Sequence, residues 1–81
     1  MDTRVAVLAI IIENPDSVAS VNAALHESRD YIIGRIGIPY RTKGISIISI
    51  AVDAPQPLVS ALSGKLGQLP GVSCKAVYSK V

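Results

Sequence analysis

The stretch IIGRIGIPYRTKGISIISIAVDAP (residues 32–55) decides the predicted fold. Most of it belongs to two isoleucine-rich segments, residues 31–40 and 45–53, which are separated by a short polar loop at 41–44. Isoleucine favours strands, and two strands joined by so short a loop form an antiparallel hairpin. Pro55 follows, and proline favours the first turn of a helix. The stretch therefore predicts a strand, a second strand and a helix, in that order.

The residues before the hairpin predict another strand and another helix. Within residues 4–13, apolar side chains occupy both the odd and the even positions, so both faces of a strand here would be apolar. This is typical of a strand covered on both faces. Asn14 and Pro15 then form a helix start, with the asparagine as the N-cap. This helix should end near residues 28–30. Its apolar stripe has helical spacing and consists of Val18, Val21, Ala24 and Leu25.

The residues after the hairpin predict a second helix and a last strand. Leu58, Leu62 and Leu66 recur at every fourth position, which predicts an amphipathic helix. The sequence Leu-Pro-Gly-Val at 69–72, called the LPGV turn below, combines two strong turn formers. It should lead into a final strand over residues 72–80.

The predicted element order is β-α-β-β-α-β, which defines the ferredoxin-like class of α+β folds. Right-handed crossovers in its two βαβ halves place both helices on one face of a four-stranded antiparallel sheet. Numbered along the chain, the strands should lie in the order 4-1-3-2, with the first and third in the centre. The chain has 81 residues, and we expect a single domain over residues 1–81.

The composition predicts a second buried surface in addition to the core. The chain is 49% hydrophobic but only 4% aromatic, and both parities of the two central strands are apolar. Two helices cover one face only, and exposing the other would cost several kcal/mol at about 25 cal/mol per Å². The pattern does not say which face meets the helices. We expect the uncovered face to join copies of the chain in a dimer or tetramer, through Val5, Val7, Ile11, Ile45 and Ile47.

Charge and cysteine content exclude some partners and locations. Eight basic and six acidic residues give a net charge of +2, which is too balanced to indicate a nucleic-acid or anionic-membrane partner. The apolar run at 5–12 is shorter than a membrane helix, which needs about 20 residues. The one cysteine, Cys74, excludes an intramolecular disulfide and favours a reducing, cytoplasmic location.

Several short motifs together resemble one protein family. They are DYIIGR (30–35), GIPY (37–40), ISIIS (45–49), DAP (53–55), LSGKLG (62–67) and the LPGV turn. With these motifs, the whole chain resembles the small ACT-like regulators of iron-only hydrogenase systems, which are similar to the C-terminal domain of the nickel-responsive repressor. The resemblance implies an ACT-like fold, a homo-oligomer and a regulatory role.

Two departures limit the sites that the resemblance implies. Amino-acid-binding ACT domains usually carry a glycine after the first strand, where this chain has Asp16. The nickel-responsive repressor holds its metal through several histidines and a cysteine, whereas this chain has one of each, His26 and Cys74. We therefore expect no metal site. His26 is better explained as a cation at a helix C-terminus, and Cys74 as a small buried hydrophobic residue.

The strand at 31–40 is the candidate ligand site, and two interpretations stay open. As an edge strand, it would use its proline and its charges to discourage pairing with other strands. Alternatively, its glycines let a ligand or a neighbouring subunit approach, while nearby basic residues attract an anionic ligand. The ligand-binding candidates are Gly34, Arg35, Gly37, Tyr40 and Arg41, with Lys43 adding positive charge.

No serine has a histidine evidently placed to activate it, so we expect no catalytic residues and no cofactor. The sequence predicts a non-catalytic regulatory or sensory module that forms a homo-oligomer and binds a small molecule at a subunit interface. The alternative is a protein-interaction or assembly module without a small-molecule ligand. Either module would act on a regulatory protein partner.

Overall fold

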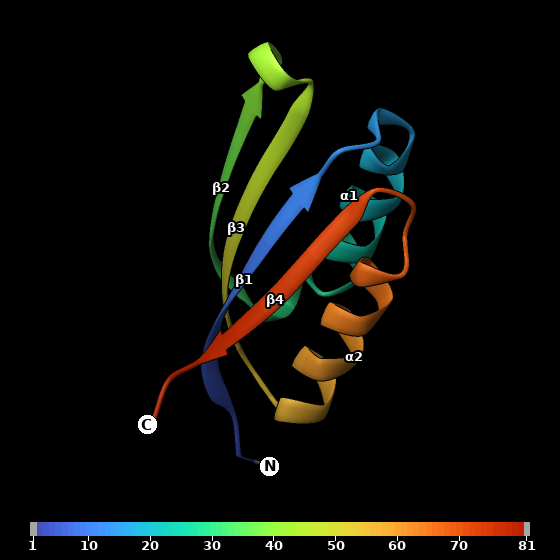
Figure 1. The fold of residues 1–81 in the computed structure, drawn as a ribbon. Coiled ribbons are helices and arrows are strands. Elements are labelled where there is room, and N and C mark those ends of the chain that lie inside the picture. Colours follow the sequence, from blue (N-terminus) through green and yellow to red (C-terminus); the bar gives the residue numbers. More distant parts are fainter. Residues whose placement is uncertain (1, 81) are drawn as a thin grey trace.

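A computed structural model describes residues 2–80 and has the predicted β-α-β-β-α-β order. The described residues form one antiparallel sheet and two α-helices, arranged as Figure 1 shows. The strands and helices are β1 (Arg4–Ile12), α1 (Val18–Glu27), β2 (Ile32–Tyr40), β3 (Ile45–Ala54), α2 (Gln56–Gly67) and β4 (Val72–Tyr78). Short 3-10 turns lie at η1 (Pro15–Ser17), η2 (Arg29–Tyr31) and η3 (Arg41–Lys43). The predicted α+β, ferredoxin-like fold class is confirmed.

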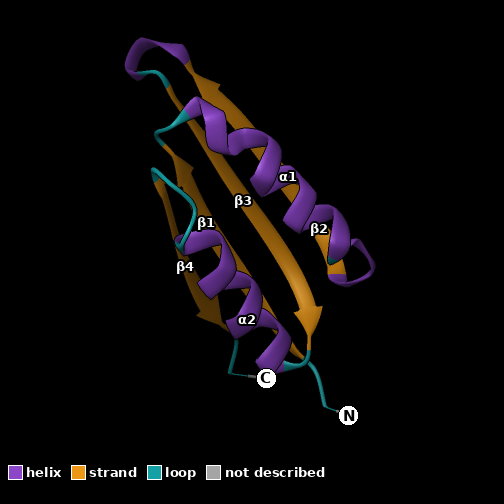
Figure 2. Ribbon diagram, turned by 90° about the vertical axis from the view of Figure 1, so that its right-hand side faces the viewer, coloured by secondary structure: helices purple, strands orange, loops and turns teal. Residues whose placement is uncertain are grey.

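The sheet has the predicted topology. Its strand order is β2-β3-β1-β4, with the first and third strands in the centre, and all three pairings are antiparallel. Both helices lie on the same face of the sheet (Figure 2). Between residues 2 and 80, no helix is long and apolar enough to cross a membrane.

The structure identifies the sheet face that the helices cover, which the sequence pattern left open. The buried residues of β1 are at even positions, and so are the buried residues of β3, which lie opposite even positions of β1. They are Ala6, Leu8, Ile10 and Ile12 in β1, and Ile48, Ile50, Val52 and Ala54 in β3. The helices complete this core with Val21, Ala24, Leu25, Val59, Leu62 and Leu66. The core is aliphatic throughout, as the low aromatic content requires.

The LPGV turn is fastened to the start of α1. The Glu13 backbone N–H donates to the Gly71 carbonyl at 2.7 Å, and the buried Ser17 hydroxyl donates to the Pro70 carbonyl at 2.6 Å. Gly71 has a φ of +66°, in the left-handed region, and a Cβ added there would lie 2.6 Å from the Asn14 Cβ. Asn14 is an N-cap, as predicted, but of the 3-10 turn η1 that leads into α1: its side chain accepts from the Asp16 N–H at 3.0 Å. Only glycine fits at position 71.

The hairpin of β2 and β3 extends away from the rest of the molecule. Its closed end, η3, stands apart from the helices in Figures 1 and 2. Every residue of β2 after Ile32 is exposed, so this edge strand is accessible on both faces. A bulge at Ile33 shifts the register between β2 and β3. The strand with the candidate ligand residues is therefore the least covered strand of the sheet.

Candidate functional site

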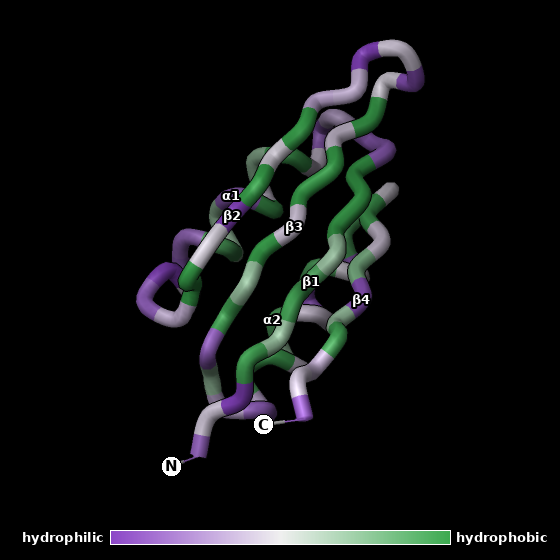
Figure 3. Tube along the Cα trace, turned by 90° about the vertical axis from the view of Figure 1, so that its left-hand side faces the viewer, coloured by the Kyte–Doolittle hydropathy of each residue, from purple (hydrophilic) through white to green (hydrophobic). Residues whose placement is uncertain are grey.

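The side of the sheet opposite the helices, called the open face, is apolar. Large apolar side chains from all four strands are exposed on it or half-buried in it: Val5, Val7 and Ile11 of β1, Ile36, Ile38 and Tyr40 of β2, Ile45 and Ile47 of β3, and Val77 of β4. Figure 3 looks onto the sheet from this side and shows hydrophobic segments along its strands. Two charged residues, Asp53 and Lys75, share the open face through their pairing with Val5 and Ala9.

All five predicted interface residues lie on this open face. Val5, Val7 and Ile11 are at odd positions of β1, which lie opposite odd positions of β3, and Ile45 and Ile47 are at odd positions of β3. Whether they form an interface stays a prediction. The sequence reasoning missed the more exposed members, including Ile36 at 63% and Val77 at 68% exposure. The alternation of β2 already placed Ile36 and Tyr40 on one side, but only the register with β3 assigns that side to the open face.

The five candidate ligand residues do not converge on one point. Gly34 and Tyr40 lie on the open face, whereas Arg35 and Gly37 pair with the buried Ile50 and Ile48 and so lie on the helix side. Arg41 belongs to η3, at the closed end of the hairpin.

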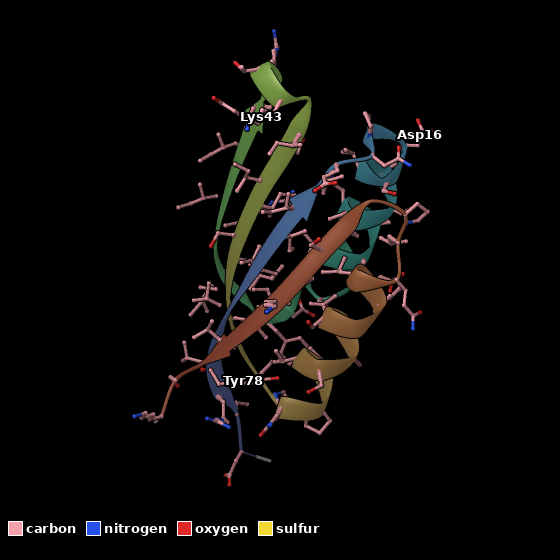
Figure 4. All side chains as sticks on the ribbon, in the orientation of Figure 1. Asp16, Lys43 and Tyr78 are labelled. Carbon is pink, nitrogen blue, oxygen red and sulfur yellow. The ribbon has the colours of Figure 1, made fainter. Side chains whose placement is uncertain are left out.

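Lys43, which the sequence reasoning added for its charge, also lies in η3, and Figure 4 shows it at the end of the hairpin. The basic residues at 35 and at 41–43 therefore do not form one cluster.

Arg35 instead lies in a groove between α1 and β2, called the α1–β2 groove. Its Nη2 donates to the Oδ1 of Asn22 on α1 at 2.6 Å. Asn22 and Arg35 line two pockets of the groove. One pocket, of about 410 Å³, is also lined by Leu25, His26, Arg29 and Ile32. The other, of about 140 Å³, is mainly apolar and includes Ile12, Val18, Gly37 and Pro39.

The sequence reasoning missed two members of this groove. His26 was interpreted only as a helix-end cation, and Arg29 was not considered. Both become neighbours of Arg35 because α1 packs beside β2. Asn22 and His26 are four positions apart on α1, which places them on the same side of the helix, and Arg29 follows in η2 just beyond its end. That spacing is the signal in the sequence that would have found them.

Comparison with protein families identifies the chain. The model of the family described as "TM1266-like: Iron-only hydrogenase system regulator, putative" matches residues 4–76. The chain belongs to this family. The resemblance expected from the motifs is thereby confirmed, and the family supports a regulatory role. No protein of curated function matches this sequence.

Solved structures similar to this family member agree with its fold. The uncharacterized protein TM1266 from Thermotoga maritima is 34% identical, with a TM-score of 0.93 over 98% of this chain and 100% of that one. The C-terminal domain of the MgtC protein from Mycobacterium tuberculosis is 15% identical, with a TM-score of 0.70 over 96% and 89%.

A formyltetrahydrofolate deformylase from Pseudomonas putida KT2440 is also 15% identical, with a TM-score of 0.67 over 90% of this chain and 28% of that chain. The two matches at 15% identity show the fold alone, and together the three fit an ACT-like fold.

In this family member Cys74 is half-buried in β4 and packs against the core. Burial raises the pKa of its thiol, and the hydrogen bond from the Ser63 hydroxyl, at 3.6 Å from Sγ, opposes this in part. Within residues 2–80, no group of three or more His, Cys, Asp and Glu side chains is arranged to hold a metal ion.

We expect Cys74 to react several-fold more slowly with iodoacetamide in the folded protein than in the chain unfolded in urea. The thiolate is the reacting species, and a raised pKa lowers its fraction at mildly alkaline pH. Mass spectrometry of timed samples measures both rates. Equal rates in the two states would contradict the expected protection.

Proposed function

We propose that this chain is a non-catalytic regulatory module of an iron-only hydrogenase system, and that it works as a homo-oligomer assembled through the open face. The observation that supports this proposal is the apolar surface contributed by all four strands. Soluble monomers rarely expose so continuous an apolar patch, and such patches usually mark an interaction site. Fully burying one large aliphatic side chain contributes about 1.5–3 kcal/mol, so covering the exposed parts of several such side chains favours pairing against the entropy cost of association.

A second copy of the chain is the partner that fits this surface best. The centre of the open face carries the small residues Ala9, Ser49 and Ala51, with larger apolar residues and Lys75 around them. Two sheets stack face to face when the side chains of one interdigitate with those of the other, about 10 Å apart. A two-fold pairing brings the same patch together from both copies, and an axis offset from the centre would let larger side chains of one copy pack over the small residues of the other.

The sensing part of the proposal places a small ligand beside β2, where the edge strand is exposed on both faces. Ligand binding there would change the oligomer or its contact with a regulatory protein partner, in a reducing cytoplasm. The alternative is an assembly module without a small-molecule ligand. It is favoured by the open face itself, whose exposed large side chains are mostly apolar, with Asp53 and Lys75 as its charged residues.

Ile36→Glu tests the assembly. Its side chain is 63% exposed in the single chain, so the substitution should leave the monomer folded while placing a charge in the proposed interface. We expect the parent to sediment as a dimer or tetramer at micromolar concentration and Ile36→Glu to sediment as a monomer. Ser20→Glu is the matched control, because it adds the same charge at an exposed position of α1.

Sedimentation velocity over a range of protein concentrations measures the oligomeric state of the parent and both variants, and circular dichroism checks that each variant is folded. A parent that is monomeric across the micromolar range would refute the proposed oligomer. Dissociation of Ser20→Glu to the same extent as Ile36→Glu would show that the interface lies elsewhere.

A further inference from the structure

The α1–β2 groove carries positive charge that the protein does not balance. Arg29 and Arg35 line its larger pocket beside His26, and among residues 2–80 no acidic residue lines either pocket. The side-chain ion pair within residues 2–80 is Lys65–Glu27, at 3.1 Å, which does not involve the groove arginines. Both arginines donate to neutral acceptors instead, Arg35 to the Asn22 amide and Arg29 to the His26 carbonyl at 3.0 Å.

The arginines are held in place yet keep donors for a ligand. A guanidinium has five N–H donors, and the bond to Asn22 uses one of those of Arg35. Gly37 lies on the same side of β2 as Arg35, and a Cβ added there would meet no atom of residues 2–80 within 4 Å, so this side of the strand is open beside Arg35. A planar fork of donors held in this way suits a carboxylate, which it binds bidentately.

The smaller pocket of the groove indicates which group is attached to the anion. It shares Asn22 and Arg35 with the larger pocket, and its walls include the apolar side chains of Ile12, Val18 and Pro39. If an anionic group occupies the larger pocket, a short aliphatic chain attached to it would contact these apolar walls. The absence of acidic residues from both pockets disfavours a zwitterionic amino acid, whose ammonium group would lack a carboxylate partner.

We propose that the α1–β2 groove binds a short-chain aliphatic carboxylate. The carboxylate lies against Arg29 and Arg35 in the larger pocket, and the aliphatic chain enters the smaller pocket beside Gly37. This inference deepens the proposed function, on which its regulatory meaning rests, because it names the class of ligand that the module senses.

The position of the groove also connects the ligand to assembly. Arg35 lies on the helix side of β2, and the next residue, Ile36, lies on the open face. The ligand and a second copy of the chain would therefore contact opposite sides of the same edge strand, which is bonded to β3 alone. A ligand that changes the oligomer equilibrium must in turn bind the monomer and the oligomer with different affinities.

The test is an NMR titration of the whole chain with butyrate, followed through the backbone amides and the Arg Nε–H groups. We expect saturable shifts at Arg35, Gly37 and Arg29. Arg35→Gln and Arg29→Gln should each weaken binding by about tenfold or more, because each removes a charge-assisted hydrogen-bond donor. The matched control Arg41→Gln removes the same charge at the closed end of the hairpin and should bind butyrate like the parent.

Three further probes define the ligand class. Butyramide, which has the same chain without the charge, and 2-aminobutyrate, which adds the ammonium group, should both bind more weakly than butyrate. Saturation by inorganic phosphate but not by butyrate would overturn the aliphatic-carboxylate assignment. Equal weakening in Arg35→Gln and Arg41→Gln, or no saturable shift with butyrate, would overturn the site.

The outcome is independent of the assembly experiment. A parent that is monomeric but binds butyrate in the groove would refute the proposed oligomer and leave the site intact. A parent that is oligomeric but shows no saturable NMR shift with butyrate would support the proposed oligomer and refute the ligand site.

Discussion

Gly71→Ala is expected to lower the free energy of unfolding by about 2–4 kcal/mol. Two effects combine at this position. The left-handed φ of +66° costs an L-residue with a side chain about 1–2 kcal/mol, and the new methyl group meets backbone as well as side-chain atoms of Asn14. The Asn14 backbone nitrogen would lie only 2.8 Å from the added Cβ, so the two turns would have to move apart.

Gly44→Ala is the matched control for this prediction. Gly44 has the same φ of +66°, but a Cβ added there meets nothing within 4 Å. The difference between the two variants in urea unfolding therefore measures the contact with Asn14 alone. Since each kcal/mol lowers the melting temperature of so small a domain by about 4–8 °C, thermal melts should separate the two variants clearly. Equal losses in both would mean that the LPGV turn does not press against Asn14.

Ile10→Ala is the second substitution with a large expected effect. Ile10 is fully buried beneath the helices, and truncating such a residue costs about 2–5 kcal/mol through lost burial and the cavity left behind. Its neighbour Ile11 is 40% exposed on the open face. Ile11→Ala makes the same chemical change on the same strand, and at concentrations where the protein is monomeric it should cost less, about 1–2 kcal/mol, because its side chain is only partly buried.

Chemical unfolding at several protein concentrations compares the two variants. The loss in Ile10→Ala should be the same at every concentration. The loss in Ile11→Ala should grow as concentration rises, because in the proposed oligomer Ile11 becomes buried and its truncation weakens association. A large loss in Ile11→Ala that does not depend on concentration would place Ile11 in the core of the monomer.

The fold could be predicted because its local signals agree with one another. The short loop at 41–44 required a hairpin, Asn14 and Pro15 began a helix, and Leu58, Leu62 and Leu66 gave the next helix its stripe. The covered face could not be predicted, because β1 is apolar at both parities. Only the packing of the two helices distinguishes Ile10 from Ile11.

The candidate site was predicted less completely. The edge strand and Arg35 could be selected from the glycines and charges in IIGRIGIPYR. The partners of Arg35 depend on where α1 packs, and no local pattern on β2 encodes that position. The sequence suggested Arg41 and Lys43 because they are near in the chain, whereas the groove brings in Arg29 and His26 from the end of the first helix.

The fastening of the LPGV turn has a consequence for the order in which the chain can mature during synthesis. The hydrogen bond from Ser17 to Pro70 joins residues that are 53 positions apart, and β1 lies between β3 and β4. β1 therefore has both of its neighbours only after β4, which is synthesised later, has emerged from the ribosome. Until then β1, which is rich in isoleucine and valine, stays partly unpaired. The newly made strand thus depends on the LPGV turn and β4 to protect it from association with other chains.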